Sequence, residues 1–184
     1  VGGFVPNDFI SNQDLEKVLD TTDEWITTRT GIKKRRILKD EGKGTSYLAI
    51  KAAEDLIAKR NIDPETIDLV IVATITPDYK GAASAPSVAS AIKANNAYAF
   101  DLSAACSGFL YGMSSATSYI ESGRYKKVLL IGADKMSSVV DYTKRETSIL
   151  FGDGAGAVLV EPSKNEFGWE DEYLRSDGIG AEWL

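Results

Sequence analysis

The sequence predicts an α/β fold with a mixed, mostly parallel sheet covered by helices. Short segments of mostly apolar residues occur at residues 69–73, 97–102 and 128–133, with Asp101 as their one charged member, and segments with helical periodicity lie between them. Continuous apolar runs of this length are typical of strands buried on both faces of a sheet. We therefore expect all three segments to be central strands, and we find no repeat or linker that divides the chain.

Helical signals alternate with these strands. Thr21 and Glu24 have the spacing of a capping box, and Gly31 follows as a stop signal, which predicts a short helix that carries Trp25. Residues 45–60 have apolar side chains at three-to-four spacing, which predicts one buried stripe. Its members are Leu48, Ala49, Ala52, Ala53, Leu56 and Ile57. Asp63 and Pro64 then begin a further turn.

The second half of the chain continues the pattern. A helix is predicted before the stop signal at Gly123, from an apolar stripe made of Phe109, Leu110, Met113, Ala116, Thr117 and Ile120. This places Cys106 at a strand-to-helix junction. Residues 155–160 resemble a further strand, next to glycines that permit close backbone approach.

Composition limits the possible functions. The chain has 184 residues, 43% of them hydrophobic and 26% charged, which is ordinary for a globular domain. Its net charge of −6 would repel a polyanion, so we expect no extended nucleic-acid binding. The cluster of cations within residues 33–39 is interpreted as a solvated face.

Residue counts suggest a cytoplasmic protein. One cysteine cannot form an intramolecular disulfide, and no apolar stretch approaches the ~20 residues that span a bilayer. Residues 1–6 lack the features of a signal peptide, and because Val1 is not a natural start we expect a few residues to be missing. The chain has no histidine, the commonest general base and metal ligand, and we expect no metal site.

Cys106 is the candidate nucleophile. The N–H groups and dipole at the start of the following helix favour a thiolate, which is the nucleophilic form of cysteine. The alternative is that Cys106 is a small buried core residue.

Trp25 and Arg145 are candidates for holding a planar base, since an aromatic face and a guanidinium can sandwich one. The alternatives are a partly buried anchor for Trp25 and a surface ion pair for Arg145. The glycine-rich run at 152–156 is not a dinucleotide fingerprint, because a strand follows it where the fingerprint needs a helix.

Three segments together resemble the β-ketoacyl-acyl-carrier-protein synthase III family. Residues 21–32 resemble its coenzyme A adenine-binding segment, residues 104–109 its nucleophile motif, and residues 151–157 its final core strand. The resemblance covers nearly the whole chain and implies a thiolase-like fold. Residues 1–184 would be the N-terminal domain, the first of two similar halves, with the C-terminal half absent.

The resemblance also implies a reaction. Cys106 would take an acyl group from acyl-CoA, and malonyl-acyl carrier protein would then supply the carbon nucleophile in the first condensation of fatty-acid synthesis. Trp25 and Arg145 would clamp the adenine, and Arg29 and Thr21 would add contacts to coenzyme A. The enzyme would be a homodimer, with coenzyme A thioester as substrate and no permanently bound cofactor.

Other positions bear on the acyl chain. Phe151 and Met136 would line the acyl pocket, and the Cys106 N–H would be an oxyanion-hole donor. Many relatives carry a bulky residue at the position of Gly81, where it caps the partner's pocket, so we expect branched or longer primers here. Alternatively, the Tyr79 side chain occupies the space that the bulky residue fills in those relatives.

One departure from the family pattern limits the expected activity. The histidine and asparagine that stabilise the enolate come from the second half of the family's proteins, so we expect this fragment alone not to condense. Alternatives are a relative that uses another acyl-CoA, a hydroxymethylglutaryl-CoA synthase, and a non-catalytic binding half. The resemblance of residues 21–32 to the family's adenine-binding segment argues against a hydroxymethylglutaryl-CoA synthase.

Overall fold

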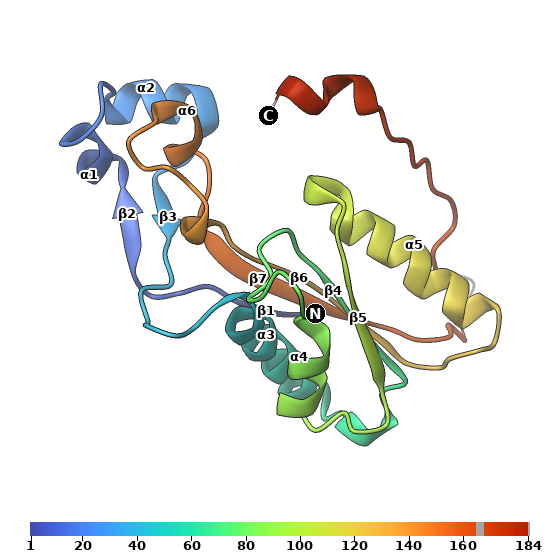
Figure 1. The fold of residues 1–184 in the computed structure, drawn as a ribbon. Coiled ribbons are helices and arrows are strands. Elements are labelled where there is room, and N and C mark those ends of the chain that lie inside the picture. The colour runs from blue at the N-terminus through green and yellow to red at the C-terminus, as the bar shows by residue number, and fades with distance from the viewer. Residues whose placement is uncertain (165–167, 184) are drawn as a thin grey trace.

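A computed structural model describes residues 1–164 and 168–183, and a five-stranded mixed sheet forms its centre (Figure 1). The order of its strands is β1-β7-β6-β4-β5. These are β1 (Gly2–Phe4), β4 (Leu69–Ala73), β5 (Tyr98–Leu102), β6 (Val128–Lys135) and β7 (Asp153–Val160). Strand β4 pairs parallel with β5 and β6, whereas β7 pairs antiparallel with β6 and β1. The predicted mixed sheet is confirmed, and two of its four strand pairs are parallel.

Helices cover both faces of this sheet (Figure 1). They are α3 (Thr45–Arg60) and α4 (Ala85–Ala91) on one face and α5 (Gly108–Glu121) on the other. A smaller group, placed to one side of the sheet in Figure 1, consists of β2 (Phe9–Ser11), β3 (Lys34–Arg36), α1 (Asn12–Glu16), α2 (Asp23–Thr30) and α6 (Arg145–Ser148). Short 3-10 helices are η1 (Pro64–Thr66), η2 (Ala105–Ser107), η3 (Met136–Ser138) and η4 (Gly178–Trp183).

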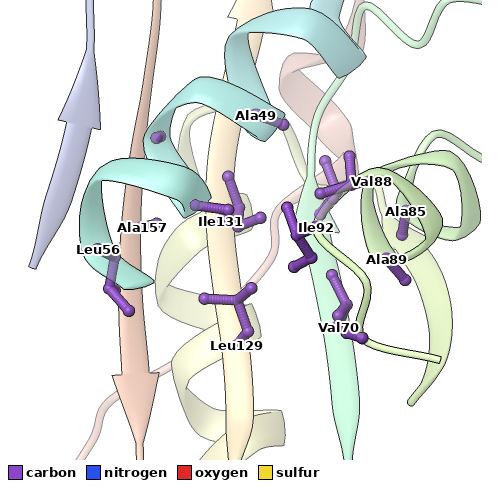
Figure 2. Packing of buried hydrophobic residues seen from close by; sticks show 14 of the residues in the cluster. Ala49, Leu56, Val70, Ala85, Val88, Ala89, Ile92, Leu129, Ile131 and Ala157 are labelled. Atoms are coloured by element: carbon purple, nitrogen blue, oxygen red, sulfur yellow. The ribbon is translucent and has the colours of Figure 1, made fainter. Parts of the chain in front are cut away.

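Alternate residues of the central strands face opposite sides, which divides the core into two clusters. On β4, Val70 and Val72 face α3 and α4, as Figure 2 shows for Val70, while Leu69 and Ile71 face α5. The predicted stripe on α3 is confirmed, since all its members are fully buried except Ile57, which is partly buried. Its alanines allow β1 to lie against α3, where a Cβ on Gly2 would collide with Ala52.

Three details of the prediction were wrong. Strand β5 lies at the edge of the sheet, because it pairs only with β4, and its Tyr98 is 43% exposed. Thr22, not Thr21, caps α2, since its Oγ1 accepts a hydrogen bond from the Trp25 N–H at 3.1 Å. Leu110, which the apolar stripe of α5 included, is 53% exposed. The stop at Gly31 is confirmed, because its φ of 72° is left-handed.

Within the described part of the chain, no helix has both the length and the hydrophobicity needed to cross a membrane.

Candidate active site

Cys106 lies in η2, between the end of β5 and the start of α5, and its side chain is exposed. The predicted strand-to-helix junction is confirmed. The alternative of a small buried core cysteine is wrong for this chain.

The turn before Cys106 is strained. Ala105 has a φ of 47°, in the left-handed region that a residue with a Cβ seldom adopts. Such strain costs on the order of 1–3 kcal/mol and concentrates at functional sites, where the surrounding structure holds it. Here it turns the chain sharply at the end of β5, so that the thiol faces outward at the first turn before α5.

A cavity of about 310 Å³ opens beside the thiol. Most of its wall consists of alanines and glycines, which leave space that larger side chains would fill. Its lining residues are Ala73, Ala105, Cys106, Phe109, Gly132, Ala133, Asp134, Met136, Gly152 and Gly154. Met136 therefore lies in the wall as expected. Phe151 is only the neighbour of a lining glycine, so its assigned role stays a prediction.

Asp134 ties together the ends of β4 and β6 beside this cavity. Its Oδ1 accepts hydrogen bonds from Thr74 Oγ1 at 2.9 Å, from Thr76 Oγ1 at 2.8 Å and from the backbone N–H groups of Ile75 and Thr76. Asp134 was not among the functional residues predicted from the sequence. A carboxylate directly after the apolar run at 128–133 was the available signal, because the carboxyl ends of parallel strands meet at one edge of a sheet.

Asp153 fixes another part of the wall. It is only 4% exposed, and its carboxylate accepts hydrogen bonds from the Leu38 N–H at 2.7 Å, the Ser137 N–H at 2.8 Å and Ser137 Oγ at 2.6 Å. Ser137 follows Met136, so these bonds hold the η3 turn against the start of β7. Burial, and secondarily the Asp153 carboxylate, raise the pKa of the nearby Tyr142 hydroxyl.

The four residues predicted to bind coenzyme A gather on the smaller group of elements. The guanidinium carbons of Arg29 and Arg145 lie 4.3 Å and 4.8 Å from the centre of the Trp25 ring. Arg145 also donates to the carbonyl oxygen of Asp20 at 3.1 Å, next to Thr21. The Thr21 Oγ1 is buried and has no hydrogen-bond partner among the described residues. The arrangement offers an aromatic face with two cations, suited to a planar base with phosphates.

Gly81 lies in the exposed segment after β4, outside the wall of the Cys106 cavity. A Cβ at Gly81 would meet no atom within 4 Å, and the Tyr79 side chain is 73% exposed. No Tyr79 atom lies within 4 Å of that Cβ in the single chain, and both the effect of Gly81 and the alternative role of Tyr79 in the dimer stay predictions. Among the described residues, no cluster of histidine, cysteine or acidic side chains could hold a metal ion.

Chemically, the site presents one exposed thiol at the mouth of a small-residue cavity, and a separate aromatic and cationic surface. A thiol in this setting can accept a group from an activated ester, and the cavity can hold a short apolar chain.

In sequence, this chain is similar to proteins that are named as acyl-carrier-protein synthase III. A sequence profile of the family described as 3-oxoacyl-[acyl-carrier-protein (ACP)] synthase III matches residues 100–178. The chain is 52% identical over 184 residues to β-ketoacyl-[acyl-carrier-protein] synthase III 2 of Bacteroides thetaiotaomicron, covering 100% of this chain and 55% of the relative. The chain spans about half the length of the curated relatives it matches.

Solved structures agree with the sequence. The fold is similar to 3-oxoacyl-[acyl-carrier-protein] synthase III from Aquifex aeolicus, with a TM-score of 0.86 and 50% identity over 90% of this chain and 53% of that one. It is also similar to the Thermus thermophilus β-ketoacyl-[acyl carrier protein] synthase III, with a TM-score of 0.93 and 42% identity over 98% of this chain and 56% of that one. In sequence and in its thiolase-like fold, the chain belongs to the β-ketoacyl-[acyl-carrier-protein] synthase III family, matching the N-terminal half of its members.

Proposed function

We propose that Cys106 accepts an acyl group from acyl-CoA, as the first step of a condensation with malonyl-acyl carrier protein that initiates fatty-acid synthesis. The observation that carries this proposal is the exposed thiol on a strained turn, beside a cavity of about 310 Å³ with small residues in its wall. The printed names of the relatives, which specify an acyl-carrier-protein synthase, support the choice of reaction.

The transfer step uses groups of this chain. The Cys106 thiolate attacks the thioester carbonyl, the carbonyl oxygen becomes negatively charged, and the coenzyme A thiolate leaves as the new thioester forms. The Cys106 N–H is the donor we assign to the developing oxyanion.

The second step needs groups beyond those on this chain. Malonyl-carrier protein loses CO₂, and the resulting carbanion attacks the Cys106 thioester, which releases the sulfur and forms the β-ketoacyl product. This chain has no histidine. We therefore assign the groups that stabilise the enolate to the half of the relatives that this chain does not match, with residues 1–184 as the N-terminal thiolase-like domain.

Binding of coenzyme A completes the proposal. Trp25 and Arg145 would hold the adenine, and Arg29 and Thr21 would add further contacts. A homodimer is part of the same proposal, because β5 is an edge strand with one unpaired side and an exposed Tyr98. We place the protein in the cytoplasm, where a nucleophilic thiol stays reduced.

The test is covalent labelling of the full-length protein with acetyl-CoA, followed by intact-mass measurement and peptide mapping. One acetyl group should appear on Cys106, and Cys106→Ser should remove it. Ser107→Ala, which keeps the thiol, is the matched control and should still be acylated. Acetylation at another residue with Cys106 unmodified would refute the proposal, and no labelling at all would favour a non-catalytic binding half.

A further inference from the structure

Arg35, the middle residue of β3, is almost completely buried, with 2% of its surface exposed, so the interpretation of residues 33–39 as a solvated face is wrong at this position. Its Nε and Nη2 both donate to the carbonyl oxygen of Ile149, at 2.8 Å and 2.5 Å, and its Nη1 donates to Asn12 Oδ1 at 2.5 Å. No ion pair with a carboxylate is formed by Arg35 within the described residues. The guanidinium therefore donates to two uncharged acceptors, a backbone carbonyl and a side-chain amide.

The first acceptor belongs to the element that carries Arg145. Helix α6 is a single turn that begins at Arg145, and Ile149 is its C-terminal capping residue. A helix this short has little stability of its own, so its position depends on tertiary contacts. The cation beside its terminal carbonyl also has a favourable interaction with the helix end.

The second acceptor holds the element that carries Trp25. Asn12 is completely buried, and its Nδ2 donates to Asp23 Oδ1 at 2.6 Å, to Thr27 Oγ1 at 3.3 Å and to the Ile32 carbonyl at 2.8 Å. Asp23 and Thr27 flank Trp25 on α2. The Arg35 guanidinium is thus connected to α2 through one buried amide side chain, and to α6 directly.

The chemistry of this buried connection requires arginine. A buried cation without a carboxylate is costly, and an apolar side chain of similar volume would often be at least as stable at such a position. Only a guanidinium supplies donors in a rigid planar fork that reach a carbonyl on one side and an amide on the other. The apolar contacts between the same elements, including Trp25 and Ile149, would remain without it.

We propose that Arg35 is a positioning residue for the coenzyme A clamp, whose buried guanidinium sets α6 with Arg145 against α2 with Trp25. The inference rests on the proposed function, since it takes these two side chains to be the adenine site. Figure 1 shows α2 and α6 side by side, above the β2 and β3 strands, although they come from opposite ends of the chain. The sequence motif around Trp25 does not indicate a positioning role for Arg35, because the Ile149 carbonyl that accepts its hydrogen bond lies 114 residues away in the sequence.

The experiment tests the Arg35→Met and Arg35→Lys variants of the full-length protein with two ligands, coenzyme A and a small thioester. Coenzyme A affinity is measured by calorimetry, and Cys106 acylation is measured with the acetyl thioester of N-acetylcysteamine, which has no adenine nucleotide. We expect about a tenfold weaker coenzyme A affinity in both variants. Acylation by the small thioester should stay within twofold of wild type, because the Cys106 turn is separate from the clamp.

Matched controls decide whether Arg35 acts through the clamp. Arg36→Lys changes the next residue of β3, whose Nη1 also donates to backbone carbonyls, of Pro6 and Asn7, and it should leave coenzyme A affinity unchanged. In a Trp25→Ala background, Arg35→Lys should cause little further loss, because the site that it positions is already damaged.

The outcomes are distinguishable. Unchanged coenzyme A affinity in both Arg35 variants, a fully additive loss in the Trp25→Ala background, or a loss of acylation by the small thioester as large as the loss of coenzyme A affinity would overturn the inference, and the last includes general unfolding. If Trp25→Ala itself leaves affinity unchanged, the adenine site is elsewhere, and both the clamp and the role of Arg35 are refuted.

Discussion

Arg145 lies over the face of Trp25, with 4.8 Å between its guanidinium carbon and the ring centre. A base stacked between them would need van der Waals spacing on both sides, a separation of roughly 7 Å. The Arg145 side chain must therefore move outward, breaking its hydrogen bond to the Asp20 carbonyl.

The clamp gives the first prediction. Trp25→Ala and Arg145→Ala should each weaken coenzyme A binding by a few-fold to about thirty-fold, the range expected for desolvated cation and aromatic contacts of roughly 0.5–2 kcal/mol. Calorimetry on the full-length protein measures this. Arg124→Ala, which removes a guanidinium 5.7 Å from the Tyr125 ring, is the control and should have no effect. Unchanged affinity in both clamp variants would exclude this site.

Gly81 gives a prediction about the acyl chain. If an aromatic residue at this position limits a pocket in the dimer, Gly81→Phe should shift preference from branched or longer thioesters toward acetyl-CoA. Each buried methylene contributes up to ~0.8 kcal/mol, so the ratio of specificity constants should change severalfold. The measurement compares kcat/KM for acetyl-, isobutyryl- and hexanoyl-CoA. A wild type that already strongly prefers acetyl-CoA, with the same ranking in Gly81→Phe, would contradict the idea.

Asp153→Asn should destabilise the protein and slow acylation of Cys106. An amide has one acceptor oxygen in place of two, so at least one of the donors on Leu38 and Ser137 loses its partner, at a cost of about 1–3 kcal/mol. Urea unfolding and the acylation rate measure the two effects. Asp141→Asn, in an exposed turn with Thr143, is the control. Wild-type stability in Asp153→Asn would show that the η3 turn is held by other contacts.

The correction at the start of α2 can also be tested. Thr22→Ala should lower the free energy of unfolding by about 0.5–2 kcal/mol, because it removes the side chain that caps the Trp25 N–H. Thr21→Ala removes a buried hydroxyl that has no hydrogen-bond partner among the described residues, and should be neutral or slightly stabilising. A larger loss of stability for Thr21→Ala than for Thr22→Ala would restore the capping box at Thr21.

Local pattern determined most elements of this protein. The stripe of α3, the apolar β4 and β6, and the glycine stop at Gly31 follow from spacing and backbone preference, which act over a few residues. The position of Cys106 between a strand and a helix was readable for the same reason. Motifs in the sequence also indicated the family, which the relatives and the fold support.

Only the tertiary structure decided how distant segments meet. The apolar β5 has the pattern of a central strand, but strand order depends on packing across the whole sheet and places it at the edge. The bonds of Asp153 to Leu38 and of Arg35 to Ile149 join residues more than a hundred positions apart. No local spacing encodes them, because a buried polar group takes whichever partner the folded chain brings within reach.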